Sequence, residues 1–131
     1  MKKTFVSETN EIVGFSIAYY SDFLKKLKKD DAYTDSDKII EKIISFPEPF
    51  LYWDQLCVRP EFFKRPYGGL LYYRTAEEAL RHSINVAYCA VALRPWMNKV
   101  SLDFIQKYGW ALMEEVTIKS GLTFGIYTRE L

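Results

Sequence analysis

The sequence predicts an α/β protein built on one mixed β-sheet, with a parallel β-α-β core and flanking antiparallel hairpins. The core is indicated by two apolar runs, 50–58 and 84–93, which lie on either side of a helical pattern. A strand, a crossover helix and a second strand form a right-handed unit with parallel strands. The hairpins are indicated by two further pairs of apolar runs, one before this unit and one after it.

Both hairpins are predicted from the residues between their strands. The first pairs residues 3–7 with residues 12–20 across a short polar turn. The last pairs residues 110–119 with residues 122–129 across Ser120-Gly121, a frequent turn dipeptide. These hairpins add antiparallel strands to the parallel core, so the expected sheet is mixed and not doubly wound.

A helical excursion is expected over residues 22–49, between the first hairpin and the central strand. Isoleucines recur there at helical spacing, and Asp35 or Ser36 is the expected N-cap of the second helix. Pro47 ends the pattern. We expect all these elements to form a single domain, residues 1–131.

The crossover helix is expected from about Tyr67 to His82, and its last turn carries cations that suit the helix dipole. Its expected inward face consists of Tyr72, Tyr73, Ala76, Ala79 and Leu80. The strand 84–93 is apolar almost throughout, which is typical of a strand buried on both faces.

A short helix is expected from about Lys99 to Tyr108, followed by Gly109 in the left-handed C′ position. Its expected inward residues are Ser101, Phe104, Ile105 and Tyr108. The three tryptophans, Trp53, Trp96 and Trp110, are expected in the core or in the walls of a groove.

Composition excludes several classes of protein. Hydrophobic residues make up 49% of the 131 residues and charged residues 27%, which excludes a disordered chain. The net charge of +1 gives no reason to expect a nucleic acid or a membrane as partner. Cys57 and Cys89 both lie in apolar runs. We therefore expect two core thiols in the reducing cytoplasm, with no signal peptide and no membrane span.

An anion site is predicted where the crossover helix begins. Gly68 and Gly69 open this helix directly after a basic loop that contains Lys64 and Arg65. Helix N-termini present unpaired N–H groups and a partial positive charge, which favour diphosphate binding. Glycine permits close approach of a ligand to the backbone, and Tyr67 offers a further amide.

The same segment resembles motif A of the GNAT superfamily of acetyl-CoA-dependent N-acetyltransferases. Val58-Arg59-Pro60-Glu61 matches the lead-in of that motif, Gly68 its last loop position, and Leu70-Leu71 its helix start. Residues 98–110, NKVSLDFIQKYGW, resemble motif B of the same family. The resemblance covers residues 3–131 and implies a GNAT-like fold.

The resemblance implies acetyl-CoA as co-substrate, with its pantetheine arm between the strands that end at Val58 and Leu93. Besides the glycines and the basic loop, it implies a site formed by Leu56, Cys57, Val58, Asn98, Ser101 and Phe104. Ordinary core packing, and a helix N-cap at Asn98, remain alternatives for these residues. The site requires that the helix start faces a cleft and that the two strands are not paired along their whole length.

Catalytic groups are few. Asp54 is the candidate general base, and a solvated carboxylate on the strand is the alternative. Where the family often has a tyrosine as general acid, this chain has Ile105, and Pro66 replaces the first motif glycine. The single histidine, His82, is expected in the last turn of the crossover helix, where a cation suits the helix dipole. We expect no metal site, because no cluster has metal-ligand spacing.

Two functions follow from these observations. One is an enzyme that transfers an acetyl or similar acyl group from acetyl-CoA to an unidentified small-molecule or peptide amine. The other is a catalytically inactive GNAT-like binding or regulatory module with a degenerate CoA site. We also expect the chain to lack the opening strand and helices of the family, so a homodimer mate or a partner chain completing the sheet is a further alternative.

Overall fold

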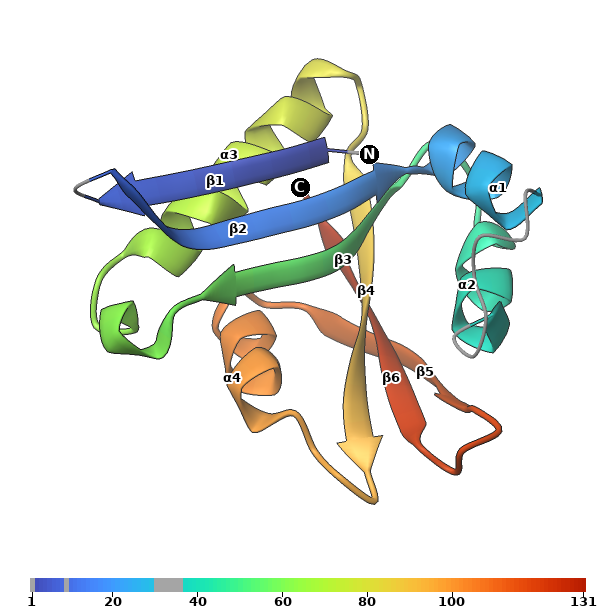
Figure 1. Ribbon diagram of the computed structural model, residues 1–131. Helices are drawn as coiled ribbons and strands as arrows, with labels where there is room; N and C mark the ends of the chain where they lie inside the picture. The colour runs from blue at the N-terminus through green and yellow to red at the C-terminus, as the bar shows by residue number, and fades with distance from the viewer. Residues whose placement is uncertain (1, 9, 30–36) are drawn as a thin grey trace.

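The computed structural model describes residues 2–8, 10–29 and 37–131. Within them, six strands form one sheet in the order β1-β2-β3-β4-β6-β5 (Figure 1). The strands are β1 (Lys2–Glu8), β2 (Glu11–Tyr20), β3 (Leu51–Val58), β4 (Val86–Arg94), β5 (Ala111–Thr117) and β6 (Thr123–Glu130). The helices are α1 (Ser21–Lys29), α2 (Asp37–Ile44), α3 (Tyr67–Arg81) and α4 (Lys99–Lys107), with a short 3₁₀ turn, η1 (Pro60–Phe62).

The sheet is mixed, as predicted. Strands β3 and β4 are parallel and are joined by α3, whereas the other neighbouring pairs are antiparallel. The first hairpin closes at Glu8 opposite Glu11. In the last hairpin Gly121 has a φ of +91°, which glycine adopts without strain. The α/β class with a parallel β-α-β core and flanking hairpins is therefore confirmed.

The parallel pair at the centre of the sheet is short. Its registered positions are Leu51 opposite Ala87 and Tyr52 opposite Tyr88. Beyond these two positions β3 and β4 diverge, as Figure 1 shows. The two strands are therefore not paired along their whole length, which is the condition that the predicted site requires.

A β-bulge in β3 lies directly after the paired positions. In the ladder with β2, Trp53 is opposite Ala18 and Gln55 is opposite Ile17, so Asp54 is the extra residue. A bulge bends its strand and increases its twist, and bulges are frequent next to active sites. The bulge thus bends β3 at the point where it separates from β4.

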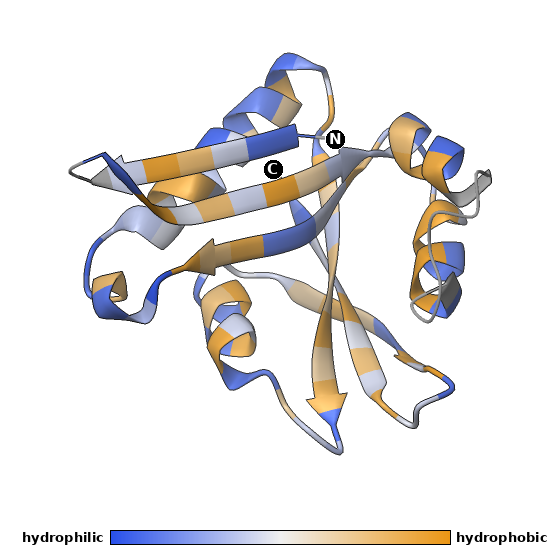
Figure 2. Ribbon diagram, viewed as in Figure 1, coloured by the Kyte–Doolittle hydropathy of each residue, from blue (hydrophilic) through white to orange (hydrophobic). Residues whose placement is uncertain are grey.

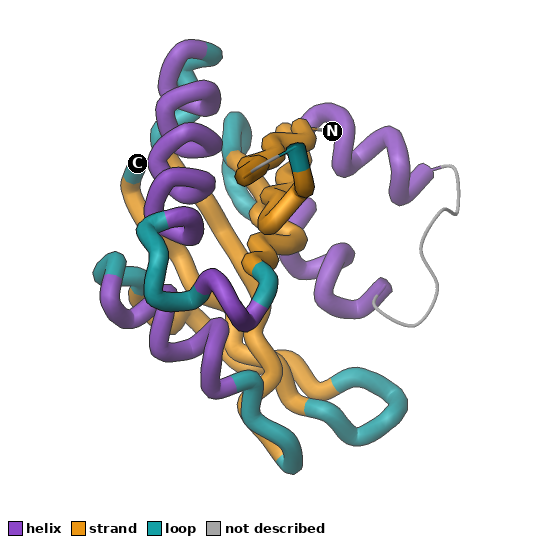
Figure 3. The backbone as a smooth tube through the Cα atoms, turned by 60° about the vertical axis from the view of Figure 1, so that its left-hand side comes forward, coloured by secondary structure: helices purple, strands orange, loops and turns teal. Residues whose placement is uncertain are grey.

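Helices cover both faces of the sheet (Figure 3). Successive strand residues point to opposite faces, and this divides the core. Tyr52 and Tyr88 pack in one cluster with Leu24 of α1 and Ile40 of α2. Hydrophobic and hydrophilic residues share these two helices (Figure 2), as expected for helices with one buried face.

The other face of the sheet packs against α3 and α4. Trp53 and Cys89 lie there in one cluster with Ala79 of α3 and Ile105 of α4. A buried polar contact links the sheet to α3. Within the sheet, Trp53 Nε1 donates a hydrogen bond of 2.8 Å to Ser16 Oγ. The Thr75 hydroxyl of α3 lies 3.0 Å from the same oxygen. The candidate site lies on this face, where α3 and α4 adjoin the diverging strands β3 and β4.

Helices α1 and α2 occupy the predicted excursion of residues 22–49, except that α1 begins one residue earlier, at Ser21. The predicted caps Asp35 and Ser36 lie outside the described residues. That residues 1–131 form a single domain stays a prediction.

The predicted inward face of α3 is partly wrong. The buried residues of this helix are Leu71, Tyr72, Thr75, Ala76 and Ala79. Tyr73 is 62% exposed and Leu80 is 47% exposed. Each follows a buried position by one residue, and a step of about 100° turns it away from the sheet.

The end of α4 is as predicted. Gly109 has a φ of +78°. Its N–H donates to Gln106 O at 3.1 Å, and the N–H of Trp110 donates to Ile105 O at 3.1 Å. These two bonds form a Schellman motif, in which a left-handed residue follows the helix. The motif fixes the position of Trp110 relative to α4.

Two predictions about single side chains are wrong. Cys89 is buried as expected, but Cys57 is exposed and is not a core thiol. Its side chain lines the cavity described below, at a position where β3 has already separated from β4. Trp96 is 62% exposed and belongs to neither the core nor the lining of the cavity described below.

The described residues offer neither a membrane-spanning helix nor a metal-binding cluster. None of their helices is long and apolar enough to cross a membrane. They also contain no group of three or more histidine, cysteine, aspartate or glutamate side chains that could hold a metal ion.

Candidate functional site

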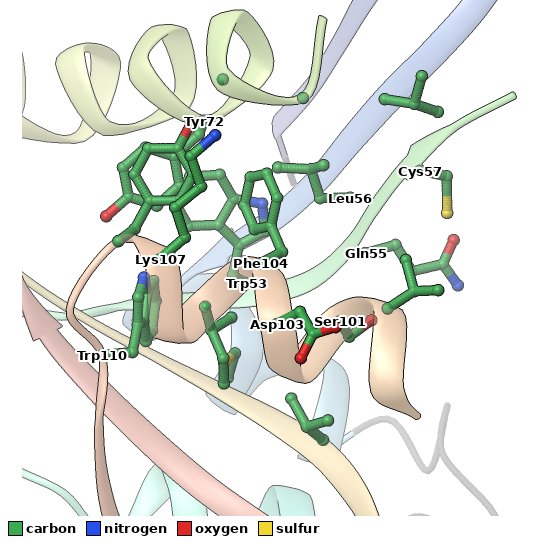
Figure 4. Close-up of a pocket in the computed structure, with 18 of the residues that line it drawn as sticks. Trp53, Gln55, Leu56, Cys57, Tyr72, Ser101, Asp103, Phe104, Lys107 and Trp110 are labelled. Carbon is green, nitrogen blue, oxygen red and sulfur yellow. The ribbon is translucent and has the colours of Figure 1, made fainter. Parts of the chain in front are cut away.

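A cavity of about 670 Å³ opens between the diverging strands. One wall is β3, and the opposite wall comes from β4 together with α4 (Figure 4). The start of α3 forms a further side. The lining includes Asp54, Leu56, Cys57, Val58, Arg65, Pro66, Gly68, Gly69, Tyr72, Cys89, Val91, Ser101, Phe104, Ile105, Lys107 and Trp110. The cavity is thus placed by the short β3–β4 ladder and by the two helices that follow these strands.

Asp54, the residue of the bulge, places a carboxylate in the cavity lining. Its side chain reaches the surface, but the surrounding walls remove part of its hydration. This desolvation raises the pKa of Asp54 above the ordinary value of 3.8. A carboxylate with a raised pKa binds a proton more tightly, which suits a general base.

Cys57 lies in the same lining. Partial burial raises the pKa of its thiol above 9.0, and the negative charge of Asp54 raises it further. A thiol with a raised pKa is a poor nucleophile at neutral pH. The sulfur is therefore better suited to contact a ligand than to attack one.

The start of α3 opens onto the cavity. Pro66 is the N-cap residue and makes no side-chain cap, and the N–H of Leu70 donates to Pro66 O at 3.0 Å. The amides of Gly68 and Gly69 belong to the first turn, where an α-helix offers them no internal acceptor. With Arg65 in the same lining, this end of α3 has the charge and the donors for an anion.

The two glycines also allow α4 to pack against α3. A Cβ on Gly68 would lie 3.1 Å from Phe104 Cε2, and a Cβ on Gly69 would lie 2.7 Å from the hydroxyl oxygen of Tyr108. Both positions therefore exclude a side chain because of neighbouring rings. The rings reduce the free space beside the first turn of α3, but Gly68 and Gly69 still line the cavity.

Aromatic rings gather on one side of the cavity (Figure 4). Tyr72 stacks on Trp53 at 5.0 Å between ring centroids and on Tyr108 at 4.4 Å. Trp110 meets Trp53 edge-on at 6.2 Å, and Phe104 lies 4.8 Å from Tyr108. We call these five residues the aromatic end. Gln55 and Cys57 lie on the opposite side of the view.

Most of the predicted site residues come together around this cavity. Those in its lining are Asp54, Leu56, Cys57, Val58, Arg65, Gly68, Gly69, Ser101 and Phe104. Lys64 is exposed outside the lining. The Tyr67 ring packs on Phe62, and Asn98 caps α4 by accepting the N–H of Ser101 at 3.2 Å. The binding roles of all these residues stay predictions.

The aromatic end contains site residues that the sequence did not reveal. Tyr72 lines the cavity although its pattern predicts only a core position, and Trp110, expected in the core or in a groove wall, lines it as well. One signal for Tyr72 is its spacing, because it follows Gly68 and Gly69 by about one helical turn. Trp110 has no such signal, since the turn at Gly109 determines its position.

No protein-family model and no curated protein matches this sequence. Solved structures do match the fold. A GNAT family acetyltransferase from Elizabethkingia anophelis with acetyl-CoA bound gives a TM-score of 0.61 at 15% identity, over 98% of this chain and 75% of that one. This chain has the GNAT fold.

Two further structures agree with the GNAT fold. An N-acetyltransferase from Staphylococcus aureus Mu50 gives a TM-score of 0.66 at 13% identity, over 97% of this chain and 69% of that one. The NatC complex bound to Gag peptide and CoA gives a TM-score of 0.64 at 10% identity, over 96% of this chain and 65% of the matched one. The chain thus spans about two thirds to three quarters of the length of these three structures. The fold expected from the resemblance to motifs A and B is confirmed.

Proposed function

We propose that this chain transfers an acetyl or similar acyl group from acetyl-CoA to an amine. The observation that carries the proposal is the cavity between β3 and β4, which reaches the start of α3. Two of the matched GNAT structures contain acetyl-CoA or CoA, which supports the same ligand class here. The acceptor would be a small molecule or a peptide, and the NatC complex with Gag peptide supports the peptide class.

The residues present fit CoA in three respects. Among the described residues, the edge of β3 that faces the cavity pairs with β4 only as far as Tyr52, so its later backbone is available to an extended pantetheine arm. The first turn of α3 and Arg65 suit a diphosphate. Gly68 and Gly69 keep that turn free of side chains of their own. When bound, acetyl-CoA supplies an activated thioester.

Asp54 would act as the general base. An alkylammonium group has no free electron pair, so a proton must leave it before its nitrogen can attack a carbonyl carbon. Asp54 lies at the bulge where the strands separate, and its raised pKa favours acceptance of that proton. The bond from nitrogen to the acyl carbon would then form as the carbon–sulfur bond breaks, and the thiolate would leave.

A side-chain acid for the leaving thiolate is not provided where the family often has one. Ile105 is buried at that position. The hydroxyl of Tyr108 lies beside Gly69 at the start of α3, so it is closer to the expected diphosphate. The nitrogen loses a second proton as the amide forms, and the thiolate would take up that proton by way of water. Catalysis would rest on positioning and on removal of the ammonium proton.

The test is binding followed by turnover. We expect calorimetry with acetyl-CoA and with desulfo-CoA to give micromolar affinity, and thiol release to follow when an amine panel is added. Asp54→Asn should retain binding and lose most of the thiol release. A titration without heat or thermal stabilisation at millimolar ligand would rule out the enzyme.

A second candidate is a GNAT-like module without catalytic activity. Pro66 lacks an N–H at the start of α3, and Phe104 and Tyr108 lie close against the two glycines. Both features reduce the room and the donors for a diphosphate. This alternative predicts weak CoA binding or none, with no thiol release for any amine.

Two properties of the whole protein are part of the proposal. The first is a location in the cytoplasm. The second is a homodimer, or a partner chain that completes the sheet at β1, which is an edge strand with Phe5 57% exposed. Sedimentation or size-exclusion measurements over a range of concentrations would separate a monomer from a dimer.

A further inference from the structure

One buried hydrogen-bond donor in the cavity wall has no acceptor. Trp110 is only 8% exposed and lines the cavity. Its Nε1 atom is fully buried and makes no hydrogen bond to any residue that the structure describes. The indole nitrogen can only donate, and a buried indole N–H usually finds a partner. An unmet donor beside a cavity is a natural partner for a ligand oxygen, which reaches the buried nitrogen once a neighbouring ring moves aside.

The other two tryptophans do not share this property. Trp53 donates its N–H to Ser16 Oγ at 2.8 Å. Trp96 is largely exposed, so water can accept its N–H. Among the three tryptophans the unmet donor is thus specific to Trp110. The hydroxyl of Tyr20 is also buried without a hydrogen-bond partner among the described residues, but Tyr20 does not line the cavity.

Trp110 lies near the point where β3 and β4 separate. Its ring contacts Trp53, which directly follows the last registered pair of β3 and β4. It also contacts Tyr72 edge-on at 6.4 Å. The surroundings are therefore mainly apolar rings, which suit a neutral oxygen on an otherwise apolar chain better than a charged one.

We propose that Trp110 Nε1–H donates a hydrogen bond to a carbonyl oxygen of the acyl-pantetheine arm. This inference rests on the proposed function, because it takes its ligand from it. The arm is neutral, and its amide and thioester carbonyls are acceptors of the required kind. Trp110 is a positioning residue if an amide carbonyl accepts, and it also polarises the reacting carbonyl if the thioester accepts.

The test is a nuclear magnetic resonance titration of the full, ¹⁵N-labelled chain, observed at its three indole N–H signals. Trp110→Phe and Trp96→Phe assign the signals. At saturating acetyl-CoA we expect the Trp110 signal to move downfield and the Trp96 signal to stay. A shift already with CoA identifies an amide carbonyl, whereas a shift only with acetyl-CoA identifies the thioester.

Calorimetry on the same samples separates the two proposals. Binding of both ligands without movement of the Trp110 signal overturns the inference and leaves the proposed function intact. Absence of binding overturns both. Trp110→Phe should weaken acetyl-CoA binding about three- to tenfold, and Trp96→Phe should leave it unchanged. The titration of the unaltered chain does not depend on whether the Trp110 variant folds.

Discussion

The side chain of Asp54 illustrates how one residue's environment sets both chemistry and stability. Desolvation raises the pKa of its carboxyl group above 3.8. The folded state therefore binds this proton more tightly than the unfolded state does. The resulting contribution to stability is complete below the unfolded pKa and is lost as the pH rises through the folded pKa.

We therefore predict opposite effects of Asp54→Asn on activity and on stability. The variant should lose about 100-fold or more in acyl-transfer rate, the usual range for a general base. The difference in melting temperature, variant minus unaltered chain, should become more positive as the pH rises from 4 to 7. Melting curves and thiol-release rates at each pH would measure both. Equal pH profiles for the two proteins would mean that Asp54 is an ordinary solvated carboxylate.

Gly69 is the residue where the packing of α3 and α4 can be tested. Alanine is better than glycine in a helix by about 1 kcal/mol, but here its Cβ would lie 2.7 Å from the Tyr108 hydroxyl oxygen. We expect Gly69→Ala to destabilise the fold by about 1 kcal/mol, because overpacking outweighs the gain in propensity. In a Tyr108→Phe background the same change should be neutral or stabilising. Denaturant titrations of the unaltered chain, both single variants and the double variant measure these changes in stability. If Gly69→Ala destabilises the Tyr108→Phe protein as much as the unaltered chain, the clash with the Tyr108 hydroxyl is not the cause.

At the scale of elements, helix α4 depends on its cap. Asn98 accepts the N–H of Ser101, so Asn98→Ala should cost about 1 kcal/mol of stability. Asn98→Ser preserves a cap and should restore most of that loss. If Asn98 only caps the helix, acetyl-CoA affinity will follow stability across both variants. An affinity that stays low in the stable serine variant would instead indicate a direct contact with the ligand.

The contact between β2, β3 and α3 is a second test at this scale. Ser16→Ala removes the acceptor of the buried Trp53 N–H, and its destabilisation should be about 1 to 3 kcal/mol. Ser7, an exposed serine of β1, is a matched control, and Ser7→Ala should change stability by less than about 0.5 kcal/mol. Denaturant unfolding of both variants gives the comparison. A Ser16→Ala protein as stable as the control would mean that the buried bond contributes nothing.

At the scale of the whole molecule, local patterns predicted the elements well. Hairpins, helices and the parallel core follow from periodicity and turn residues, since those signals act over a few neighbours. The exposure of Tyr73 and Leu80 was missed because an apolar residue at the border of a helix face gives the same pattern as one at its centre. The exposure of Cys57 was missed for a different reason: it depends on the separation of β3 from β4, a long-range feature.

The candidate site was predictable in part. The glycines and the basic loop follow from the chemistry of helix ends, and residues 56–58 follow from the resemblance to the family. The bulge at Asp54 carries no glycine or proline that would mark it in the sequence. Trp110 was expected in the core or in a groove wall, but the missing acceptor of its N–H depends on the three-dimensional arrangement.

The two registered positions between β3 and β4 also have a mechanical consequence. The sheet consists of two antiparallel halves, which we call leaves: β1-β2-β3 and β4-β6-β5. The short parallel ladder between β3 and β4, which we call the seam, joins them. One leaf carries α3 and the other leads into α4, so a molecule held in the cavity would bridge them. Amide exchange along the open edges of both leaves should then slow together when such a molecule binds, because the ligand supplies the cross-bonding that the seam lacks.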